Sequence, residues 1–334
     1  MKPKPLTAIT LVLSNLLAVS PAAPQNDSGP FNMGPVINTT ARDAEPTFTP
    51  SGQTMYFNCF DRHANVGGDI CVTHRTGDSW TDPKIVETVS TDEYLEVEPL
   101  LSPDGQELYI MSNRPGGMGS TDIWVSDLID GEWTEPRNLG APFNSADSDH
   151  CLYFGGENWD FAYWTSTRPG GFGGNDIWKS QRVNGVWQGA VNLGSKVNSA
   201  ASEHHSLPSE DGKSLYITAT RAEGFGLEDI YVTTQDNKGN WSNLVNLGPK
   251  VNSERHDRCP AFSPDFEYFF FDSERAGGFG NKDLWYVPYS QIESIRRLLY
   301  ALVSLFHWLG RAKRLLEFRL QAFPRTLQGI NCAS

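Results

Sequence analysis

Residues 112–124 of the chain read SNRPGGMGSTDIW, and variants of this stretch occur four more times. The aspartates near the ends of the five copies lie 53 or 54 residues apart, at Asp69, Asp122, Asp176, Asp229 and Asp283. A tryptophan repeats in phase with them, at Trp80, Trp133, Trp187 and Trp241. A fixed period of roughly 50 residues is typical of a β-propeller, in which each repeat forms one blade.

Each repeat contains the pattern of four short antiparallel strands. In the second repeat, EPLLSPDG (98–105) predicts a strand that ends in a turn, and ELYIMSN (107–113) alternates apolar and polar residues. The Gly-rich loop follows, then DIWVSDL (122–128), and the Asp130-Gly131 turn leads into a fourth strand. Four strands per unit are typical of a propeller blade. The fold class is therefore all-β.

The fifth repeat lacks its fourth strand. The missing piece resembles FNMGPVINT (31–39), which matches NLGAPFNS (138–145) and its counterparts inside the other repeats. The N-terminal segment is therefore predicted to complete the last blade, which removes free sheet edges. The prediction is a five-bladed β-propeller over residues 31–290.

The two ends of the chain differ from the repeats. Residues 1–22 have a basic start, an apolar run and small residues before a cleavage site, the pattern of a secretory signal peptide. Residues 23–30 form a polar leader. Residues 291–334 are basic, with apolar residues at helical spacing. This tail is interpreted as an amphipathic helix for a membrane or partner, a helix packed on the propeller, or a segment unrelated to the domain. The predicted location is periplasmic or secreted.

Composition excludes some functions. The net charge of −13 argues against nucleic acid, whose binding needs lysines and arginines at the phosphates. No nucleophile, zinc-protease or phosphate-loop motif is found in the sequence. Cys59 and Cys71 flank one Gly-rich loop and are interpreted either as a cross-strand disulfide or as two small buried residues.

The SPDG, SNRPGG and DIW elements resemble the TolB-type, WD-repeat-like β-propeller repeat of bacterial envelope proteins. The resemblance covers residues 31–290. It implies a propeller that serves as a binding platform at the cell envelope, often through protein contacts. TolB-like propellers usually have six blades, whereas five repeats are counted here.

An arginine also recurs seven or eight residues before each loop aspartate, at Arg62, Arg114, Arg168, Arg221 and Arg275. We expect these arginines and aspartates to fix the loop, by pairing with each other or with the backbone, while glycine supplies positive φ. The repeated tryptophans are expected to pack the outer strands.

The start of each first strand is the candidate functional site. Aligning the repeats on the arginine predicts that five residues are equivalent there: Asp43, Glu96, His150, Glu203 and Asp257. Two positions further on stand Glu45, Glu98, Leu152, His205 and Cys259, on the same strand face. First strands are innermost in a propeller, so both sets are predicted to surround one mouth of the channel.

Three functions follow from this pattern. The leading hypothesis is a non-catalytic platform that binds an envelope protein or glycan at the acidic mouth, through Asp43, Glu45, Glu96, Glu98, His150, Glu203, His205 and Asp257. The second is a glycoside hydrolase that uses Asp43, Glu96, Glu203 and Asp257, because crowded carboxylates split their pKa values and the resemblance to five-bladed glycosidases places acids near the axis. The third is a divalent metal ion in the channel.

Overall fold

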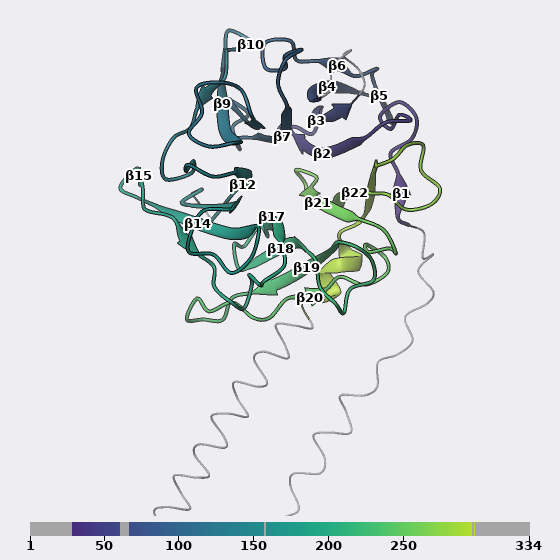
Figure 1. Cartoon of the computed structure of the whole chain (residues 1–334). Coiled ribbons are helices and arrows are strands. Elements are labelled where there is room, and N and C mark those ends of the chain that lie inside the picture. The colour runs from purple at the N-terminus through teal and green to yellow at the C-terminus, as the bar shows by residue number, and fades with distance from the viewer. Residues whose placement is uncertain (1–28, 61–66, 157, 296, 298–334) are drawn as a thin grey trace, which may run out of the picture.

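The computed structural model describes residues 29–60, 67–156, 158–295 and 297, which form five blades around a central axis (Figure 1). This confirms the predicted five-bladed propeller of antiparallel strands. The innermost strands, one per blade, are β2 (Asp43–Phe48), β7 (Glu96–Leu101), β12 (Asp149–Gly155), β17 (Glu203–Pro208) and β21 (Asp257–Phe262). They surround the axis in Figure 1.

Two further strands of six to nine residues follow in every blade. The second strands are β3 (Thr54–Phe60), β8 (Glu107–Ser112), β13 (Phe161–Ser166), β18 (Ser214–Ala219) and β22 (Tyr268–Ser273). The third strands are β4 (Gly68–Thr76), β9 (Asp122–Ile129), β14 (Asp176–Val183), β19 (Asp229–Thr234) and β23 (Asp283–Pro288). The outer edges are two-residue strands: β5 (Ser79–Trp80), β6 (Lys84–Ile85), β10 (Glu132–Trp133), β11 (Arg137–Asn138), β15 (Val186–Trp187), β16 (Val191–Asn192), β20 (Val245–Asn246) and β1 (Phe31–Asn32).

The N-terminal strand closes the ring, as predicted. β1 pairs antiparallel with β23, with Phe31 opposite Tyr286 and Asn32 opposite Trp285. Asn38 then brackets Leu284, because its Oδ1 accepts the Leu284 N–H at 2.8 Å and its Nδ2 donates to the Leu284 carbonyl at 3.0 Å. Asn144, Asn198 and Asn252 bracket Ile123, Ile177 and Ile230 in the same way.

The hydrophobic core lies between adjacent blades. One cluster joins Tyr109 and Ile123 of the second blade to Leu152 and Trp164 of the third. Another joins Phe57 of the first blade to Leu284 of the last. The outer tryptophans extend these clusters: Trp133 is buried, and Trp80, Trp187 and Trp241 pack against the core, which confirms their predicted packing role. Every interface therefore needs both of its blades, and closing the ring supplies the last blade with a neighbour.

The loop aspartates hold the Gly-rich loops through the backbone. Asp176 accepts the Phe172 N–H at 2.5 Å and the Gly173 N–H at 3.3 Å, and Asn192 Nδ2 donates to it at 3.0 Å. Gly170 has a φ of 97°, so glycine is needed in this turn. The other described loops repeat the arrangement with Asp122, Asp229 and Asp283. The predicted backbone role of the aspartates is confirmed.

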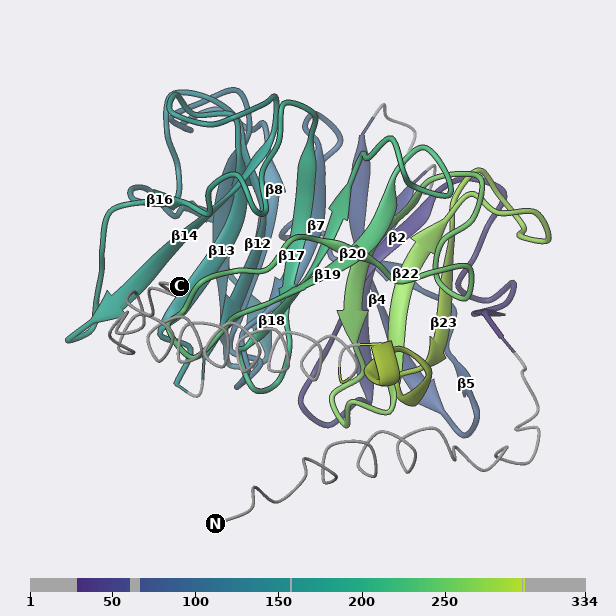
Figure 2. The ribbon, with the colours of Figure 1, turned by 90° about the horizontal axis from the view of Figure 1, so that it is seen from below.

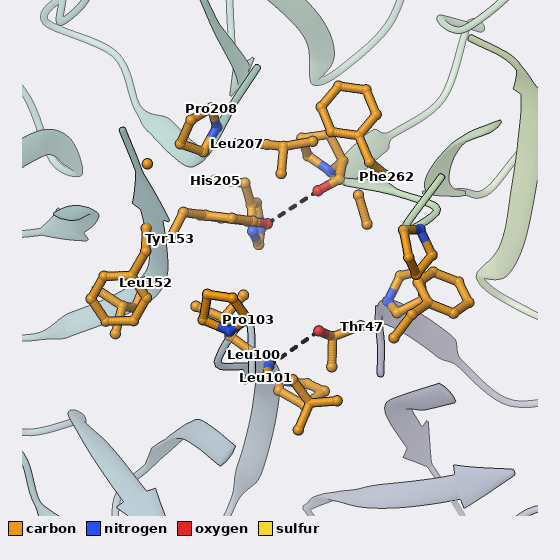
Figure 3. A pocket seen from close by; sticks show the side chains of 18 of the residues that line it. Thr47, Leu100, Leu101, Pro103, Leu152, Tyr153, His205, Leu207, Pro208 and Phe262 are labelled. Carbon is orange, nitrogen blue, oxygen red and sulfur yellow. Dashed lines mark hydrogen bonds between the residues drawn. The ribbon is translucent and has the colours of Figure 1, made fainter. Parts of the chain in front are cut away.

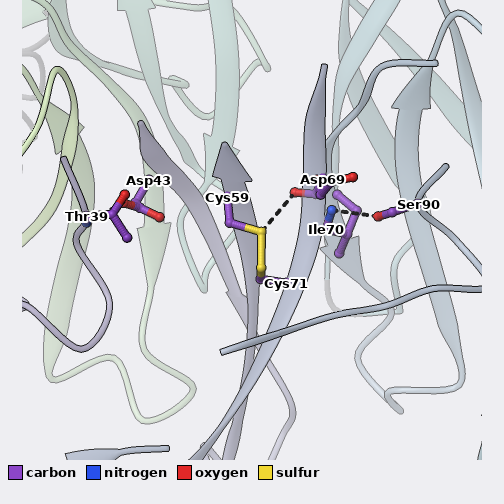
Figure 4. The surroundings of a disulfide bond; sticks show 7 residues. All are labelled: Thr39, Asp43, Cys59, Asp69, Ile70, Cys71 and Ser90. Carbon is purple, nitrogen blue, oxygen red and sulfur yellow. Dashed lines mark hydrogen bonds between the residues drawn. A yellow bond between two sulfur atoms is a disulfide. The ribbon is translucent and has the colours of Figure 1, made fainter. Parts of the chain in front are cut away.

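The cysteines that flank the first loop form a disulfide. Cys59 of β3 and Cys71 of β4 are bonded across the two strands, twelve residues apart in sequence (Figure 4). Both are fully buried and stand where the second blade has Ser112 and Trp124. The sequence left this pairing open, and the structure decides it.

Replacing both cysteines, as Cys59→Ala/Cys71→Ala, should lower the free energy of unfolding by about 3 kcal/mol, the value for a cross-link that closes a loop of this size. The measurement is the urea midpoint of the oxidised chain, with Cys332→Ser as the control. An unchanged midpoint would show that the cross-link does not form in solution.

The start of the predicted tail packs on the propeller. Residues 290–295 and 297 are helical, and Ile292 is buried in a cluster with Tyr216 and Phe269. The helix lies beside the last blade in Figure 2. Among the residues that the structure describes, no helix is long and apolar enough to cross a membrane. The predicted signal peptide and most of the tail lie outside the described residues.

Candidate functional site at the propeller axis

The strand register corrects the predicted alignment of the third blade. Asp149 pairs with Ser166, as Glu96 pairs with Ser112 and Asp257 with Ser273. Asp149 is therefore the equivalent of the other blades' acids, and the assignment of His150 was wrong by one residue. In the next set, Cys151 takes the place predicted for Leu152. The alignment slipped because the hairpin of β12 and β13 holds one residue more than the hairpin of β7 and β8, which moves Asp149 one position further from Arg168.

The first set of carboxylates is buried rather than gathered at a mouth. Asp43, Glu96, Asp149, Glu203 and Asp257 are all 0 % exposed. Four of them bind the arginine of their own blade, in the pairs Arg114–Glu96 (3.0 Å), Arg168–Asp149 (2.6 Å), Arg221–Glu203 and Arg275–Asp257 (2.6 Å). The arginines therefore pair with these acids and with backbone carbonyls, not with the loop aspartates. Asp43 accepts the N–H of Thr39 at 2.6 Å, and Arg62 lies outside the described residues.

The second set does converge on the axis, and a β-bulge in each inner strand turns it there. The pairing register shifts once in β2, β7, β12, β17 and β21, at these residues. All five have positive φ: Glu45 (57°), Glu98 (59°), Cys151 (52°), His205 (45°) and Cys259 (53°). Positive φ is uncommon for residues other than glycine and costs about 1–3 kcal/mol per residue. Five such residues at one structural position indicate that the fold requires this backbone conformation there. We call these five residues the axial ring.

Hydrogen bonds link the axial ring from blade to blade. Glu45 accepts the Glu98 N–H at 2.8 Å, and Glu98 accepts the Cys151 N–H at 2.5 Å. The remaining neighbours meet through side chains, since His205 Nε2 lies 3.7 Å from Cys151 Sγ and 3.2 Å from Cys259 Sγ. Cys259 Sγ in turn lies 3.3 Å from Glu45 Oε1. The five side chains therefore form one continuous cluster.

Burial dominates the protonation of this cluster. It raises the pKa of Glu45 to about 7 and lowers that of His205 to about 3. Burial also raises the pKa values of the Cys151 and Cys259 thiols. Burial also acts to raise the pKa of Glu98, but the charge of His150 and its hydrogen bond outweigh burial and lower this pKa to about 2. His150 Nδ1 lies 3.3 Å from Glu98 Oε1.

A second charged cluster lies beside the ring. Glu228 contacts His256 Nδ1 at 2.8 Å, Arg258 Nε at 3.0 Å and His204 Nε2 at 3.6 Å. The sequence analysis did not identify Glu228. That residue precedes a third strand, so its distance in sequence from the inner strands concealed its role.

The open cavity lies on the other side of the ring, toward the turns that join first and second strands. It has a volume of about 660 Å³, and the axial ring forms its polar floor. Figure 3 shows how Leu100, Leu152, Leu207 and Phe262 surround it. Three proline-containing turns rim it, at Pro50, Pro103 and Pro264. We call this cavity the axial funnel. Its walls combine leucine, proline and aromatic side chains with polar ones such as Thr47, Ser102 and Ser209, whereas the sequence predicted an acidic mouth.

Two aromatic residues of the third blade break the symmetry of the funnel. Tyr153 reaches across it, and its hydroxyl donates to the Pro260 carbonyl of the fifth blade at 3.3 Å (Figure 3). Trp159 stacks on Phe154 with ring centroids 5.2 Å apart, where the other blades have compact turns. A second cavity of about 420 Å³, lined by Trp159, Trp187 and Arg182, shares residues with the funnel wall.

No family model matches this chain, and no curated protein matches it in sequence. Many solved structures have a similar fold. TolB from Acinetobacter baumannii aligns with a TM-score of 0.47 and 16 % identity over 74 % of this chain and 54 % of that one. The chain thus spans about half of that TolB.

Other similar structures include a second TolB protein and a glycosidase. A putative TolB from Agrobacterium tumefaciens aligns with a TM-score of 0.47 and 16 % identity, over 76 % of this chain and 86 % of that one. An α-L-arabinofuranosidase from Lactobacillus brevis aligns with a TM-score of 0.49 and 12 % identity, over 76 % and 92 %. The similarity is one of propeller architecture, and it does not distinguish a binding protein from a glycosidase.

Proposed function

We propose that the protein is an exported, non-catalytic binding platform that takes an extended segment of a partner protein into the axial funnel. The observation that carries this proposal is the funnel itself: a concave cavity with leucine, proline and aromatic side chains on its walls and convergent polar groups at its floor. The export is supported only by the signal-peptide pattern of residues 1–22.

The chemistry of the walls favours a peptide over a glycan. Leucine, proline and phenylalanine side chains cannot pair with the hydroxyl groups of a sugar, which would lose hydrogen bonds to water on entry. An aromatic and proline-rich surface suits an apolar, proline-containing peptide in extended conformation. The turns at the rim expose Asp104, Glu210 and Asp265, so basic residues beside the apolar segment would be attracted.

A matched pair of variants tests this proposal. Trp159→Ala removes the aromatic side chain that distinguishes the third blade and should weaken binding about tenfold or more, because buried aromatic side chains dominate such interfaces. Phe225→Ala removes a more exposed aromatic ring from a Gly-rich loop, away from the funnel, and should leave binding unchanged.

The measurement is fluorescence anisotropy with two sets of labelled ligands. One set is a library of proline-rich peptides that carry lysine or arginine, and the other contains peptidoglycan fragments and plant oligosaccharides. Binding of peptides alone, lost in Trp159→Ala, supports the proposal. Binding that is equal in both variants, or confined to the sugars, contradicts it.

Glycoside cleavage is the second candidate. Of the axial carboxylates, Glu45 and Glu98 line the funnel, and their pKa values of about 7 and about 2 differ as those of an acid and a base should. The acids first predicted for this activity are buried. Release of reducing sugar from the oligosaccharide panel, abolished by Glu45→Gln, would favour this candidate.

A further inference from the structure

The axial ring has one position per blade but three kinds of side chain. The first two blades supply Glu45 and Glu98, and the next three supply Cys151, His205 and Cys259 at the same bulge. The sequence holds only five cysteines and seven histidines. Two cysteines and a histidine at three successive equivalent positions therefore place rare, metal-binding side chains together at one point.

The distances between these side chains match a metal site. In a tetrahedral zinc site, with Zn–S bonds of about 2.3 Å and Zn–N and Zn–O bonds of about 2.0 Å, neighbouring ligand atoms lie about 3.5 Å apart. His205 Nε2 lies 3.2 Å and 3.7 Å from the two sulfur atoms, and Glu45 Oε1 lies 3.3 Å from Cys259 Sγ. The ligand atoms of Glu45, His205 and Cys259 all lie within 4.8 Å of one another. Cys151 is close to His205 but lies outside that group of three and groups with Glu98 and His150, so its Sγ has to turn toward the other three to become the fourth ligand.

We propose that the axial ring binds one Zn²⁺ through Cys151 Sγ, His205 Nε2, Cys259 Sγ and Glu45 Oε1. Two thiolates and an imidazole select zinc over calcium or magnesium, which prefer oxygen ligands. This inference is independent of the proposed function, because it concerns the floor of the funnel and not its occupant.

Glu45 is the fourth ligand rather than Glu98. Glu98 Oε1 already lies 3.3 Å from His150 Nδ1 and accepts from Cys151 Sγ at 3.2 Å, and its Oε2 accepts the Cys151 N–H. Glu45 instead uses Oε2 for Asn58 and the Glu98 N–H, while its Oε1 is directed at Cys259. Glu98 and His150 then flank the site and orient Cys151, whose Sγ lies 3.0 Å from His150 Nδ1.

Binding must release protons. Both thiols are protonated without metal, and each loses its proton as its sulfur bonds to zinc. Glu45 must also be ionised to bind, so one Zn²⁺ displaces two protons above the Glu45 pKa of about 7 and a third below it. Four protein ligands make a closed site, which is the pattern of a structural zinc. Tyr153 crosses the funnel above it, between the third and fifth blades.

The experiment loads the full chain, kept reduced and stripped by chelator, with Co²⁺ and then Zn²⁺. We expect one Co²⁺ per chain, thiolate-to-cobalt charge-transfer absorption, intense tetrahedral d–d bands, and loss of these bands on adding one equivalent of Zn²⁺. Release of about two protons per metal in weak buffer, above the Glu45 pKa of about 7, should accompany loading, because two thiols are deprotonated.

Variants locate the site. Cys151→Ser and Cys259→Ser should each weaken Zn²⁺ binding beyond the roughly 10–100-fold loss typical of changes outside the ligand set. His204→Gln is the matched control, since this neighbour of His205 contacts Glu228, and it should retain the cobalt spectrum. Cys332→Ser should also retain it. Near-UV circular dichroism checks that each variant is folded, and Glu45→Gln should shift the d–d bands even where binding persists.

Four results would overturn the proposal. They are the absence of stoichiometric metal in folded wild type, cobalt bands that survive the Cys151→Ser/Cys259→Ser double variant, binding of Cu⁺ with no binding of Zn²⁺, and a thiol count showing that Cys151 and Cys259 are bonded to each other in the folded protein.

Discussion

A chain that begins at Thr39 is expected to lose cooperative folding. The truncation removes β1 and the segment after it, so β23 is left as an open edge and the last blade has three strands. It also removes Ile37, which is fully buried between the first and last blades. The loss of one buried isoleucine costs about 2–5 kcal/mol. The loss of the edge strand and of Asn38 adds to it and brings the total near the 5–15 kcal/mol that typically stabilises a whole domain.

The control for this truncation begins at Gly29, which keeps β1 and removes only residues 1–28. Circular dichroism and urea unfolding of the two chains compare their stability directly. A peptide of residues 29–40, added to the shorter chain, should restore the transition, because it supplies the missing strand. A shorter chain that unfolds with the same midpoint and slope as the control would show that the ring does not need this closure.

Arg168→Ala is expected to lower the free energy of unfolding by about 3–5 kcal/mol, the range for removing one partner of a buried ion pair. Arg168 binds the fully buried Asp149 at 2.6 Å and donates to the Pro142 carbonyl at 2.9 Å. It also lies over the rings of Trp164 and Trp178. Its removal would leave the Asp149 carboxylate buried without a counter-charge.

The control for Arg168 is another arginine–aspartate pair. Arg137 contacts Asp127 at 3.2 Å, but their side chains are 55 % and 39 % exposed. Arg137→Ala should therefore cost less than about 1 kcal/mol. Urea unfolding of both variants at equal slope is the measurement. Equal losses would contradict the view that burial makes the repeated arginine a structural element.

The repeat in the sequence was sufficient to predict the number of blades, their four strands and the closing N-terminal strand. The loop motif returns with an almost constant period, and a repeat unit can bury its apolar face only against a neighbouring copy. The segment at 31–39 matched the missing piece of the fifth repeat, and the structure places Asn32 and Asn38 in the same contacts as Asn246 and Asn252.

The candidate site was only partly predictable. Glu45, Glu98, His205 and Cys259 were identified, because two-residue spacing marks one face of a strand. Asp43, Glu96, Glu203 and Asp257 were grouped with them, but the structure buries these acids against the arginines and the turns. An acid recurs at this position because the arginine of the same blade recurs too and pairs with it, as Arg114 pairs with Glu96 and Arg275 with Asp257.

The sequence by itself determined the architecture, because architecture follows from periodic pattern and from the apolar faces that the pattern produces. Only the tertiary structure decided which side chains meet at the axis. A β-bulge shifts the pairing by one residue, and a shift of one residue moves a different side chain to the inner face. The bulge occurs in all five blades, so the extra residue in the β12–β13 hairpin is what puts Cys151 rather than Leu152 in the axial ring. Together the bulges and this hairpin bring two sulfur atoms and an imidazole, each from a different blade, to the same point.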